Sequence, residues 1–389
     1  MKTDLSVEHM RAYRCWKSKL FPPRKEKSVP DLIKYFIALN ADSIHDTYIA
    51  LYNRMHHFTR NMLEECLYRS HDAGRFRAMR KNLSLVARNH FELIFVGTYR
   101  QREFRIGQGM KTWRIEEDEF NTLARAMLKE VSGGEKRRVN LIKNIPRNEK
   151  RSVEANIHNS IAKSTNIDIV LDWLMERWQL IPGLETWSRS GRRYCLFDTF
   201  HRSGKYPLNF DKTEKELVRK YIASFGPVQL EDISWWCDLP DTRTDQILSA
   251  LSNDLHELTN SETGEKYFID AKEYRRFSSF KEPVHEVCCL LGRNDPLLLG
   301  YNFNDQIVKR QYRDTIYREY GQSAASVLLS GEVVGTWSFK ESKHKVKMDV
   351  KLFKKISLKS EDKLCMEIDR LGDFIGGEEK QTEVELIYQ

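Results

Sequence analysis

Long apolar segments are absent from this sequence. It has no apolar run of about 18 residues, the length that a membrane-spanning helix needs. The first residues also lack the apolar stretch of a secretory signal. We therefore expect a cytoplasmic protein that does not enter a membrane. The chain has 389 residues, of which 40% are hydrophobic and 31% charged, which is typical of a soluble protein with several folded units.

Cysteines with the spacing of a zinc site are also missing. The seven cysteines are scattered along the chain, and no two of them form a C-x-x-C motif. Scattered cysteines of odd number are typical of buried thiols in a reducing compartment. The sequence therefore predicts neither a metal site nor another cofactor.

Acidic residues are scarce in the first part of the chain. Residues 1–151 hold 31 Lys and Arg against 18 Asp and Glu, a net charge of +13. The remaining residues hold 33 against 38, a net charge of −5. Because the positive charges are spread over several expected helices, they indicate contact with a polyanion, above all nucleic acid.

The most informative stretch is 217–270. Apolar residues at helical spacing from Leu217 to Phe225 end at Gly226-Pro227, and two shorter helices should follow. A hairpin turning at 260–264 completes the pattern. Three helices followed by a two-stranded wing make a winged-helix unit, whose third helix often reads the DNA major groove. Here that helix carries Arg243 among carboxylates, so this unit could instead be a structural or protein-binding module.

The same order of elements is expected earlier in the chain. Ser28 should cap a helix running to Leu39, and two further helices should cover 48–55 and 59–67. The alternating stretch 83–86 would then be a wing strand. These features predict a first winged helix.

A second winged-helix-like unit is expected from helices around 120–127 and 167–178 and from a hairpin with Ser190-Gly191 at its tip. The hairpin carries Arg189, Arg192 and Arg193, flanked by Trp187 and Tyr194. Basic residues interleaved with aromatic ones suit insertion into a DNA groove, although a solvated tip would look the same.

Beyond Pro283 the pattern changes to strands, which predicts a small antiparallel β domain or barrel. The expected fold class is therefore α+β, with three tandem winged-helix units followed by this β domain. The expected boundaries are an N-terminal helical lead-in at 1–27, winged-helix units at 28–110, 111–210 and 211–282, and the β domain at 283–389.

Several short motifs, in this order and spacing, resemble those of the AlkZ/YcaQ-like family of winged-helix DNA glycosylases. They are Tyr48-Ile49-Ala50-Leu51-Tyr52-Asn53-Arg54, 79–86, Ala223-Ser224-Phe225-Gly226-Pro227, Trp235-Trp236-Cys237-Asp238-Leu239, Asp295-Pro296-Leu297-Leu298-Leu299-Gly300-Tyr301 and 331–337. The resemblance runs from about Ser28 to Phe353. It implies a monomeric repair protein that binds duplex DNA carrying an alkylated purine or an interstrand crosslink. The implied reaction is removal of N7-alkylated purines or unhooking of the crosslink.

The family's catalytic motif is Gln, an apolar residue, then Gln or Asp, and Asn40-Ala41-Asp42 matches its position. Asn40 keeps the amide but is one methylene shorter, and Ser84 stands where the family usually has His. Asp42 would stabilise the developing sugar cation or activate water, and Asn40 would hold that water. The segment could instead cap two successive helices, with Asn40 ending one and Asp42 or Ser43 beginning the next.

The resemblance also suggests DNA contacts. Arg80 and Lys81, before the first wing, are expected to bind backbone phosphates, together with Arg77. Arg54 matches a family arginine and could contact DNA or be a buried ion-pair partner. Asp295 could lie near DNA, or form a turn before Pro296. Two other functions compete with a glycosylase, namely a non-catalytic winged-helix DNA-binding protein and an interaction scaffold that binds no DNA.

Overall fold

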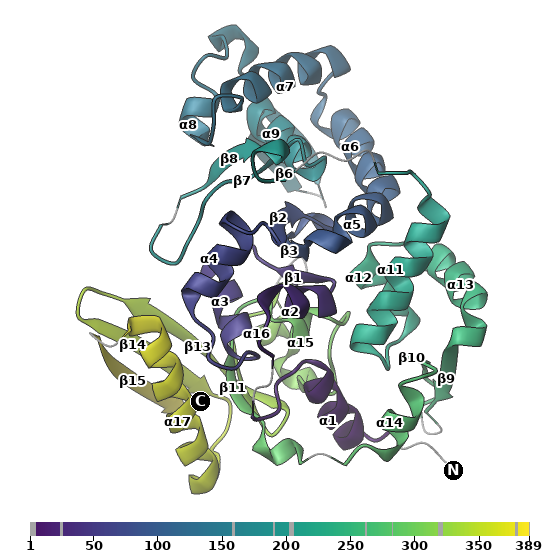
Figure 1. Ribbon diagram of the computed structural model, residues 1–389, viewed down its shortest axis with the longest axis vertical. Helices are drawn as coiled ribbons and strands as arrows, with labels where there is room; N and C mark the ends of the chain where they lie inside the picture. Colours follow the sequence, from purple (N-terminus) through teal and green to yellow (C-terminus); the bar gives the residue numbers. More distant parts are fainter. Residues whose placement is uncertain are drawn as a thin grey trace. The chain divides into compact units, whose positions relative to one another are not determined.

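The computed structural model describes residues 5–23, 26–157, 160–189, 191–201, 206–260, 263–281, 283–317, 322–377 and 380–388. The fold is α+β, as predicted (Figure 1). The chain forms two compact units: unit 1 contains Met1–Leu32, His45–Thr59 and Val218–Gln389, and unit 2 contains Ile33–Ile44 and Arg60–Leu217. Among the described residues, three helices have residues in both units, namely α2 (Val29–Tyr35), α3 (Ile44–Tyr52) and α11 (Phe210–Phe225). The five predicted domain boundaries stay a prediction.

Unit 2 consists of helices and short strands. Its helices are α4 (Arg60–Tyr68), α5 (Phe91–Gly97), α6 (Tyr99–Trp113), α7 (Glu117–Val131), α8 (Arg138–Leu141), α9 (Asn166–Glu176) and α10 (Phe197–Phe200). Its strands are β1 (Ala38–Asn40), β2 (Ala73–Arg77), β3 (Leu83–Ala87), β4 (Lys136–Arg137), β5 (Ser152–Ile157), β6 (Ser160–Thr165), β7 (Leu180–Pro182) and β8 (Arg193–Leu196). The predicted wing strand is β3, and the helices predicted around Phe120 and Ile167 are α7 and α9.

A three-stranded antiparallel sheet with the order β1-β3-β2 organises the first part of unit 2. The prediction of a helix running to Leu39 was wrong, because α2 ends at Tyr35 and Leu39 lies on β1. Ile37 has a left-handed φ of 64°, which breaks the helix, and the fully buried Leu39 pairs with Leu85 of β3. Strand pairing over a distance in sequence has overridden the local helical periodicity.

The core of unit 2 lies among α6, α7 and α9. Leu123, Met127, Val170 and Leu174 are completely buried there. The expected hairpin after 178 is present as β7 and β8, which pair from Leu180–Leu196 to Pro182–Tyr194. Ser190, at its predicted tip, lies outside the described residues. A second hairpin, β5–β6, had no prediction.

Unit 1 contains a helical part and a sheet. Its helices are α1 (Val7–Lys17), α12 (Leu230–Cys237), α13 (Asp241–Ala250), α14 (Tyr274–Ser279), α15 (Pro296–Leu299), α16 (Arg313–Ile316) and α17 (Leu358–Gly376). Its strands are β9 (Leu255–Thr259), β10 (Lys266–Asp270), β11 (Cys288–Leu291), β12 (Ser326–Leu329), β13 (Glu332–Glu341), β14 (Lys345–Leu352) and β15 (Gln381–Tyr388). The helices and the hairpin expected in 217–270 are confirmed as α11, α12, α13 and β9–β10.

The C-terminal sheet has five strands in the order β11-β12-β13-β14-β15. Its first three pairings are antiparallel, as predicted, but β14 and β15 are parallel, so the prediction of an antiparallel domain was wrong for this pair. The sequence interpretation missed the 19-residue helix α17, which connects β14 to β15 and lies along both strands (Figure 1). A helical crossover brings the chain back to the same end of the sheet, which makes a parallel pair possible.

Candidate active site

Asn40-Ala41-Asp42 lies where β1 ends. Asn40 is the last residue of the strand and stands opposite Ser84 of β3, and the Ala41 amide donates to the Leu83 carbonyl at 2.7 Å. Because the backbone is extended here, the side chains of residues 40 and 42 lie on the same side. Asn40 does not end a helix, so the helix C-cap alternative for this residue was wrong.

The Asp42 carboxylate is held by two donors. Its Oδ1 accepts from the Leu83 amide at 3.0 Å, and its Oδ2 accepts from Asn40 Nδ2 at 2.9 Å. The Asp42 amide in turn donates to Asn40 Oδ1 at 3.3 Å. These hydrogen bonds fix the orientation of the carboxylate, and Asp42 as a residue is half-buried. An anion fixed in this way can face a developing positive charge without first reorganising.

Arg75 of β2 fixes the backbone on the other side of the motif. Its Nε donates to the Ala41 carbonyl at 2.8 Å, and its Nη2 donates to the Asp42 carbonyl at 3.4 Å. Its Nη1 forms an ion pair with Glu185, and the side chains of Arg75 and Glu185 are 6% and 18% exposed. Sequence reasoning missed this role, because it expected phosphate contacts from Arg77, Arg80 and Lys81 and gave the nearby Arg75 no role. Arg75 and Arg77 are two residues apart on β2, so alternation of side chains puts both on the same face of the strand. The pattern could therefore not show that the two arginines have different roles.

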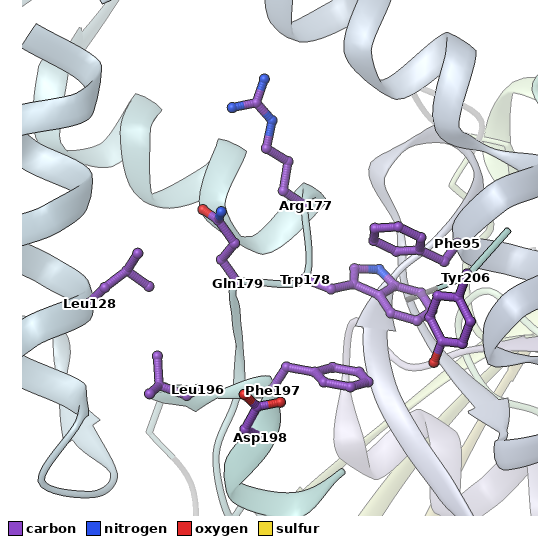
Figure 2. Close-up of a pocket in the computed structure, with 9 residues that line it drawn as sticks. All are labelled: Phe95, Leu128, Arg177, Trp178, Gln179, Leu196, Phe197, Asp198 and Tyr206. Carbon is purple, nitrogen blue, oxygen red and sulfur yellow. The ribbon is translucent and has the colours of Figure 1, made fainter. Parts of the chain in front are cut away.

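An aromatic cluster adjoins the sheet beside the motif. Phe76 of β2 stands opposite Ser84 and stacks on Trp178, with ring centroids 4.3 Å apart. Trp178 lines a cavity of about 390 Å³ in unit 2 (Figure 2). His201 contacts Phe76 at 5.2 Å between centroids, and burial lowers the pKa of its imidazole from 6.5 to about 4. His201 is therefore neutral at physiological pH.

The basic residues before β3 form a tight turn. Arg80 and Lys81 both have left-handed φ angles, of 54° and 65°. The Lys81 side chain is 50% exposed, with its Nζ 3.4 Å from Glu176 Oε1. Arg77 is less available, because its Nη1 donates to the Lys81 carbonyl and its Nη2 lies 3.3 Å from Asp172.

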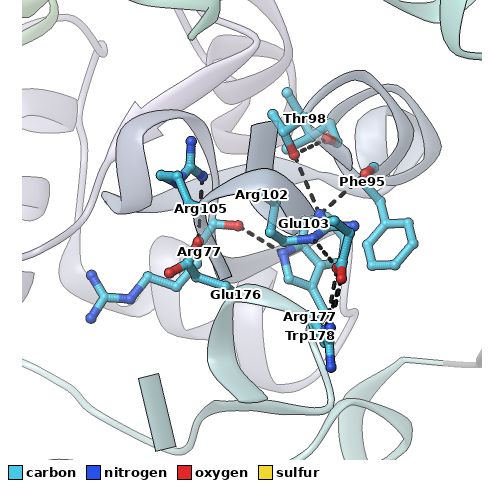
Figure 3. A network of polar contacts seen from close by, with 10 residues as sticks. Arg77, Phe95, Thr98, Arg102, Glu103, Arg105, Glu176, Arg177 and Trp178 are labelled. Atoms are coloured by element: carbon cyan, nitrogen blue, oxygen red, sulfur yellow. Dashed lines mark hydrogen bonds and ion pairs between the residues drawn. The ribbon is translucent and has the colours of Figure 1, made fainter. Parts of the chain in front are cut away.

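The carboxylate of Glu176 belongs to a wider polar network (Figure 3). Glu176 Oε2 lies 3.3 Å from Arg105 Nη2, and Glu103 makes a bidentate pair with Arg177. Burial lowers the pKa of the neighbouring Arg102 to about 10, despite the opposing effect of Glu103. Carboxylates thus neutralise much of the positive charge behind the turn, whereas half of the Lys81 side chain faces solvent.

The arginines expected on the second hairpin gather around one carboxylate. Arg189 and Arg193 lie 3.3 and 3.6 Å from Glu135 Oε1, and Arg192 is exposed. The aromatic residues beside them face inward. Trp187 is 6% exposed, under the Arg60 guanidinium at 4.0 Å, and Tyr194 is part of the core. The expectation that these two rings flank the tip as groove-inserting groups was therefore wrong, because both are buried.

Arg54 is not a surface residue, which corrects its assignment as a DNA contact. Its side chain and that of Asp295 are both 0% exposed and form a bidentate pair at 2.6 and 2.8 Å. Arg54 also donates to the carbonyls of Ser18 and Ala50. Asp295 caps α15 through the Leu297 amide, so the turn-forming alternative for this residue was right. Both residues belong to the buried interior of unit 1.

Within the described ranges, no cluster of three His, Cys, Asp or Glu side chains has the arrangement of a metal site. The same residues include no helix of sufficient length and apolarity to cross a membrane.

Comparisons with known proteins agree with the resemblance of the motifs. The family described as DNA glycosylase AlkZ-like matches residues 33–374. Among solved structures, the Streptomyces sahachiroi DNA glycosylase AlkZ has a similar fold, with a TM-score of 0.73, 17% identity and full coverage of both chains. Among curated proteins no match was found. Because the family match covers most of the chain, the protein belongs to the AlkZ-like DNA glycosylase family.

Proposed function

We propose that the protein hydrolyses the N-glycosidic bond of N7-alkylated purines in duplex DNA, with Asp42 as the catalytic carboxylate. The observation that supports this most directly is the geometry of Asp42. The residue is half-buried and lies two residues beyond the end of β1, and its carboxylate is oriented by the Leu83 amide and the Asn40 side chain, in a member of a glycosylase family.

The chemistry of the substrate explains why one carboxylate is enough. An N7-alkylated purine is already cationic, so it can leave without a general acid. The sugar then develops oxocarbenium character, which a fixed anion stabilises, and the same carboxylate can accept a proton from the attacking water. Asn40 orients this carboxylate through its 2.9 Å hydrogen bond and, in our proposal, also contacts that water.

For DNA binding we propose that three winged-helix regions and the basic part of unit 2 contact the duplex. The order α2, β1, α3, α4, β2, β3 and the order α11, α12, α13, β9, β10 both fit winged helices, and the region between them would hold the third. The candidate phosphate contacts are Arg77, Arg80, Lys81, Arg189, Arg192 and Arg193. Unhooking of interstrand crosslinks is the related reaction that the same chemistry allows.

A non-catalytic DNA-binding protein is the alternative, and one observation favours it. The Asn40 amide donates to Asp42, and Asp42 accepts from the Leu83 amide, so both residues have a structural role without any substrate. If the shorter Asn40 and Ser84 have removed the chemistry, these hydrogen bonds alone would explain the motif.

The test is release of N7-methylguanine from methylated duplex DNA. Asp42→Asn retains an oxygen that can accept from the Leu83 amide, so the position of the side chain should survive while the charge is lost. The new Nδ2 faces the Asn40 amide, which must rotate to accept from it. We expect base release to fall by a factor of about 10² to 10³, with duplex affinity and thermal stability nearly unchanged. A matched control is the exchange variant Asn40→Asp/Asp42→Asn, which retains one amide and one carboxylate but moves the charge by two positions.

We expect the exchange variant to be as slow as Asp42→Asn, because the charge no longer occupies the oriented position. Wild-type activity in Asp42→Asn would remove Asp42 from the chemistry. If the wild type binds the duplex but releases no base, the same variants should be assayed on a crosslinked duplex. Failure on both substrates would establish the non-catalytic alternative.

A further inference from the structure

The cavity beside Trp178 is a second feature of unit 2 that could bind a ligand. Its volume of about 390 Å³ is within the range of small-molecule sites, roughly 300–1,000 Å³. Its walls come from α5, α7, the turn that follows α9, β8, α10 and the segment at Tyr206. The lining residues are Phe95, Leu128, Arg177, Trp178, Gln179, Leu196, Phe197, Asp198 and Tyr206.

Aromatic side chains form one side of this cavity. In Figure 2 the rings of Phe95, Trp178, Phe197 and Tyr206 gather on that side, and Leu128 and Leu196 face them across the space. Trp178 and Phe197 pack nearly parallel to each other, with an interplanar angle of 20° and centroids 5.9 Å apart, and are only 4% and 9% exposed. Phe95 and Tyr206 are half-buried and expose more of their rings. Flat surfaces of this kind favour planar heterocycles, which gain about 1–3 kcal/mol per stacked base.

Trp178 has a backbone conformation that normally selects glycine. It follows the C-cap Arg177 of α9, with a left-handed φ of 57°. The Trp178 and Gln179 amides donate back to the carbonyls of Met175 and Leu174, the hydrogen-bond pattern of a Schellman helix end. A non-glycine residue costs about 1–2 kcal/mol there, so the indole must contribute something that glycine cannot.

The indole is also held rigidly in place. Its Nε1 donates to the Arg77 carbonyl at 2.7 Å, its ring stacks on Phe76, and the residue is 4% exposed. Because a hydrogen bond and a stacked ring hold the indole of Trp178, this part of the cavity wall has its shape before a ligand binds. Preorganisation of this kind lowers the entropic cost of binding.

The polar groups of the cavity suit an uncharged heterocycle with donors and acceptors at its edge. Arg177 makes a bidentate pair with Glu103 and points away from the rings (Figure 2), so it is poorly placed to bind an anion. Gln179 and Asp198 are exposed at the cavity and can hydrogen-bond with the edge of a ring.

The cavity is separate from the proposed catalytic centre. Its lining includes none of Asn40, Asp42 or Arg75. Asn40 and Phe76 lie on either side of Ser84 in the sheet, two strand spacings or about 10 Å apart, and Trp178 stacks on Phe76. A heterocycle bound in the cavity would therefore not be the alkylated base whose N-glycosidic bond is cleaved at Asp42 in the proposed reaction.

We propose that this cavity is a binding site for a purine-sized planar heterocycle, supplied either as a free nucleoside or as an exposed purine of a nucleic acid. The assignment does not depend on base release by Asp42.

Calorimetric titration of the full-length protein with guanosine tests this assignment, with methyl riboside as the control that lacks a base. We expect saturable guanosine binding with a Kd on the order of 1 mM or tighter, and no binding of the riboside. Leu128→Trp fills the cavity from α7 and should weaken guanosine binding by at least about tenfold. Lys129→Trp places the same ring on the next, exposed residue and should change the Kd by less than about twofold.

Circular dichroism should show that both tryptophan variants are folded, and Asp198→Asn is a milder second variant that should weaken binding by about threefold. Displacement of guanosine by a purine-containing single strand, and not by a pyrimidine strand, would identify nucleic acid as the source. The absence of displacement would identify a free nucleoside. Absence of guanosine binding by the wild type, or equal binding by folded Leu128→Trp, would overturn the assignment.

Discussion

Two buried or nearly buried arginine–carboxylate ion pairs in the molecule consist of the same chemical groups but contact different parts of the backbone. In unit 1, Arg54 and Asp295 are both 0% exposed. In unit 2, Arg75 and Glu185 are 6% and 18% exposed. Arg54 also donates hydrogen bonds to the carbonyls of Ser18 and Ala50. Arg75 instead donates to the carbonyls of Ala41 and Asp42 in the candidate catalytic motif.

The difference shows how surroundings assign a role to the same kind of pair. A fully buried pair is costly to desolvate and costly to break, so its removal acts on the whole fold. A pair whose arginine fixes the backbone of a reactive segment acts mainly on the position of that segment. Arg54 should therefore affect stability, and Arg75 should affect base release.

Breaking the buried pair should have the largest effect. Arg54→Ala leaves the Asp295 carboxylate buried without its cation and should lower the free energy of unfolding by about 3–5 kcal/mol. Urea denaturation followed by circular dichroism measures this loss. Asp295→Asn retains an acceptor for the Leu297 amide but leaves the Arg54 cation buried without its carboxylate, so it should cost a similar amount. The double variant Arg54→Met/Asp295→Asn should recover part of the loss, because no charge remains buried.

The outcome also decides between the two roles that the sequence left open for Arg54. If Arg54→Ala changed stability by less than about 1 kcal/mol and weakened duplex binding, Arg54 would be a DNA contact after all.

Arg75 sharpens the comparison at the candidate active site. Arg75→Lys retains the positive charge but lacks the planar guanidinium group. A single ammonium group cannot contact the Ala41 carbonyl, the Asp42 carbonyl and Glu185 at the same time. If the proposed function holds, the rate of base release should fall by about ten- to a hundredfold, because the motif is no longer held in position. KM and duplex affinity should change little. Single-turnover release of N7-methylguanine, with duplex affinity measured in parallel, separates these quantities.

A double variant provides the control for this prediction. Because Arg75 acts through Asp42, adding Arg75→Lys to Asp42→Asn should cause little further loss of activity. Glu185→Gln should retain the packing of the pair and cause a smaller decrease than Arg75→Lys. A decrease in duplex affinity as large as the decrease in rate would instead make Arg75 a DNA contact.

The same contrast shows what could be predicted from the sequence. Local signals were sufficient for α12, α13 and the β9–β10 hairpin, because helical spacing, Gly226-Pro227 and the turn at 260–264 are all written within a few residues. Pairing between distant segments was not predictable in the same way. The conversion of Leu39 from a helix to a strand depends on β3, and the parallel pairing of β15 depends on α17.

The candidate site shows the same limit. Position in the chain and family resemblance pointed to Asn40 and Asp42, and the extended backbone places their side chains together as the spacing required. The roles of Arg54 and Arg75 depend on burial and on partners 241 and 110 residues away in sequence. A basic residue looks the same in the sequence whether its charge meets a phosphate, a buried carboxylate or a carbonyl.

The smallest effect is expected for Lys81, which belongs to neither arginine–carboxylate pair. The Lys81 side chain is 50% exposed in the turn before β3, and its contact with Glu176 at 3.4 Å should contribute less than about 1 kcal/mol to stability. If Lys81 binds a phosphate, Lys81→Ala should weaken duplex binding similarly for all sequences and reduce the slope of log affinity against log salt by about 0.9.

Fluorescence anisotropy with an unmodified duplex at several salt concentrations measures this slope. Arg243→Ala on the acidic α13 is the matched control, and it should leave the slope unchanged because carboxylates around that arginine repel the DNA backbone. An unchanged slope in Lys81→Ala together with a decrease in Arg243→Ala would move the DNA contact from the turn before β3 to α13. Unit 2 would then lose its best candidate for a phosphate contact, whereas the buried Arg54 pair and the Arg75 pair would keep the roles that their contacts assign.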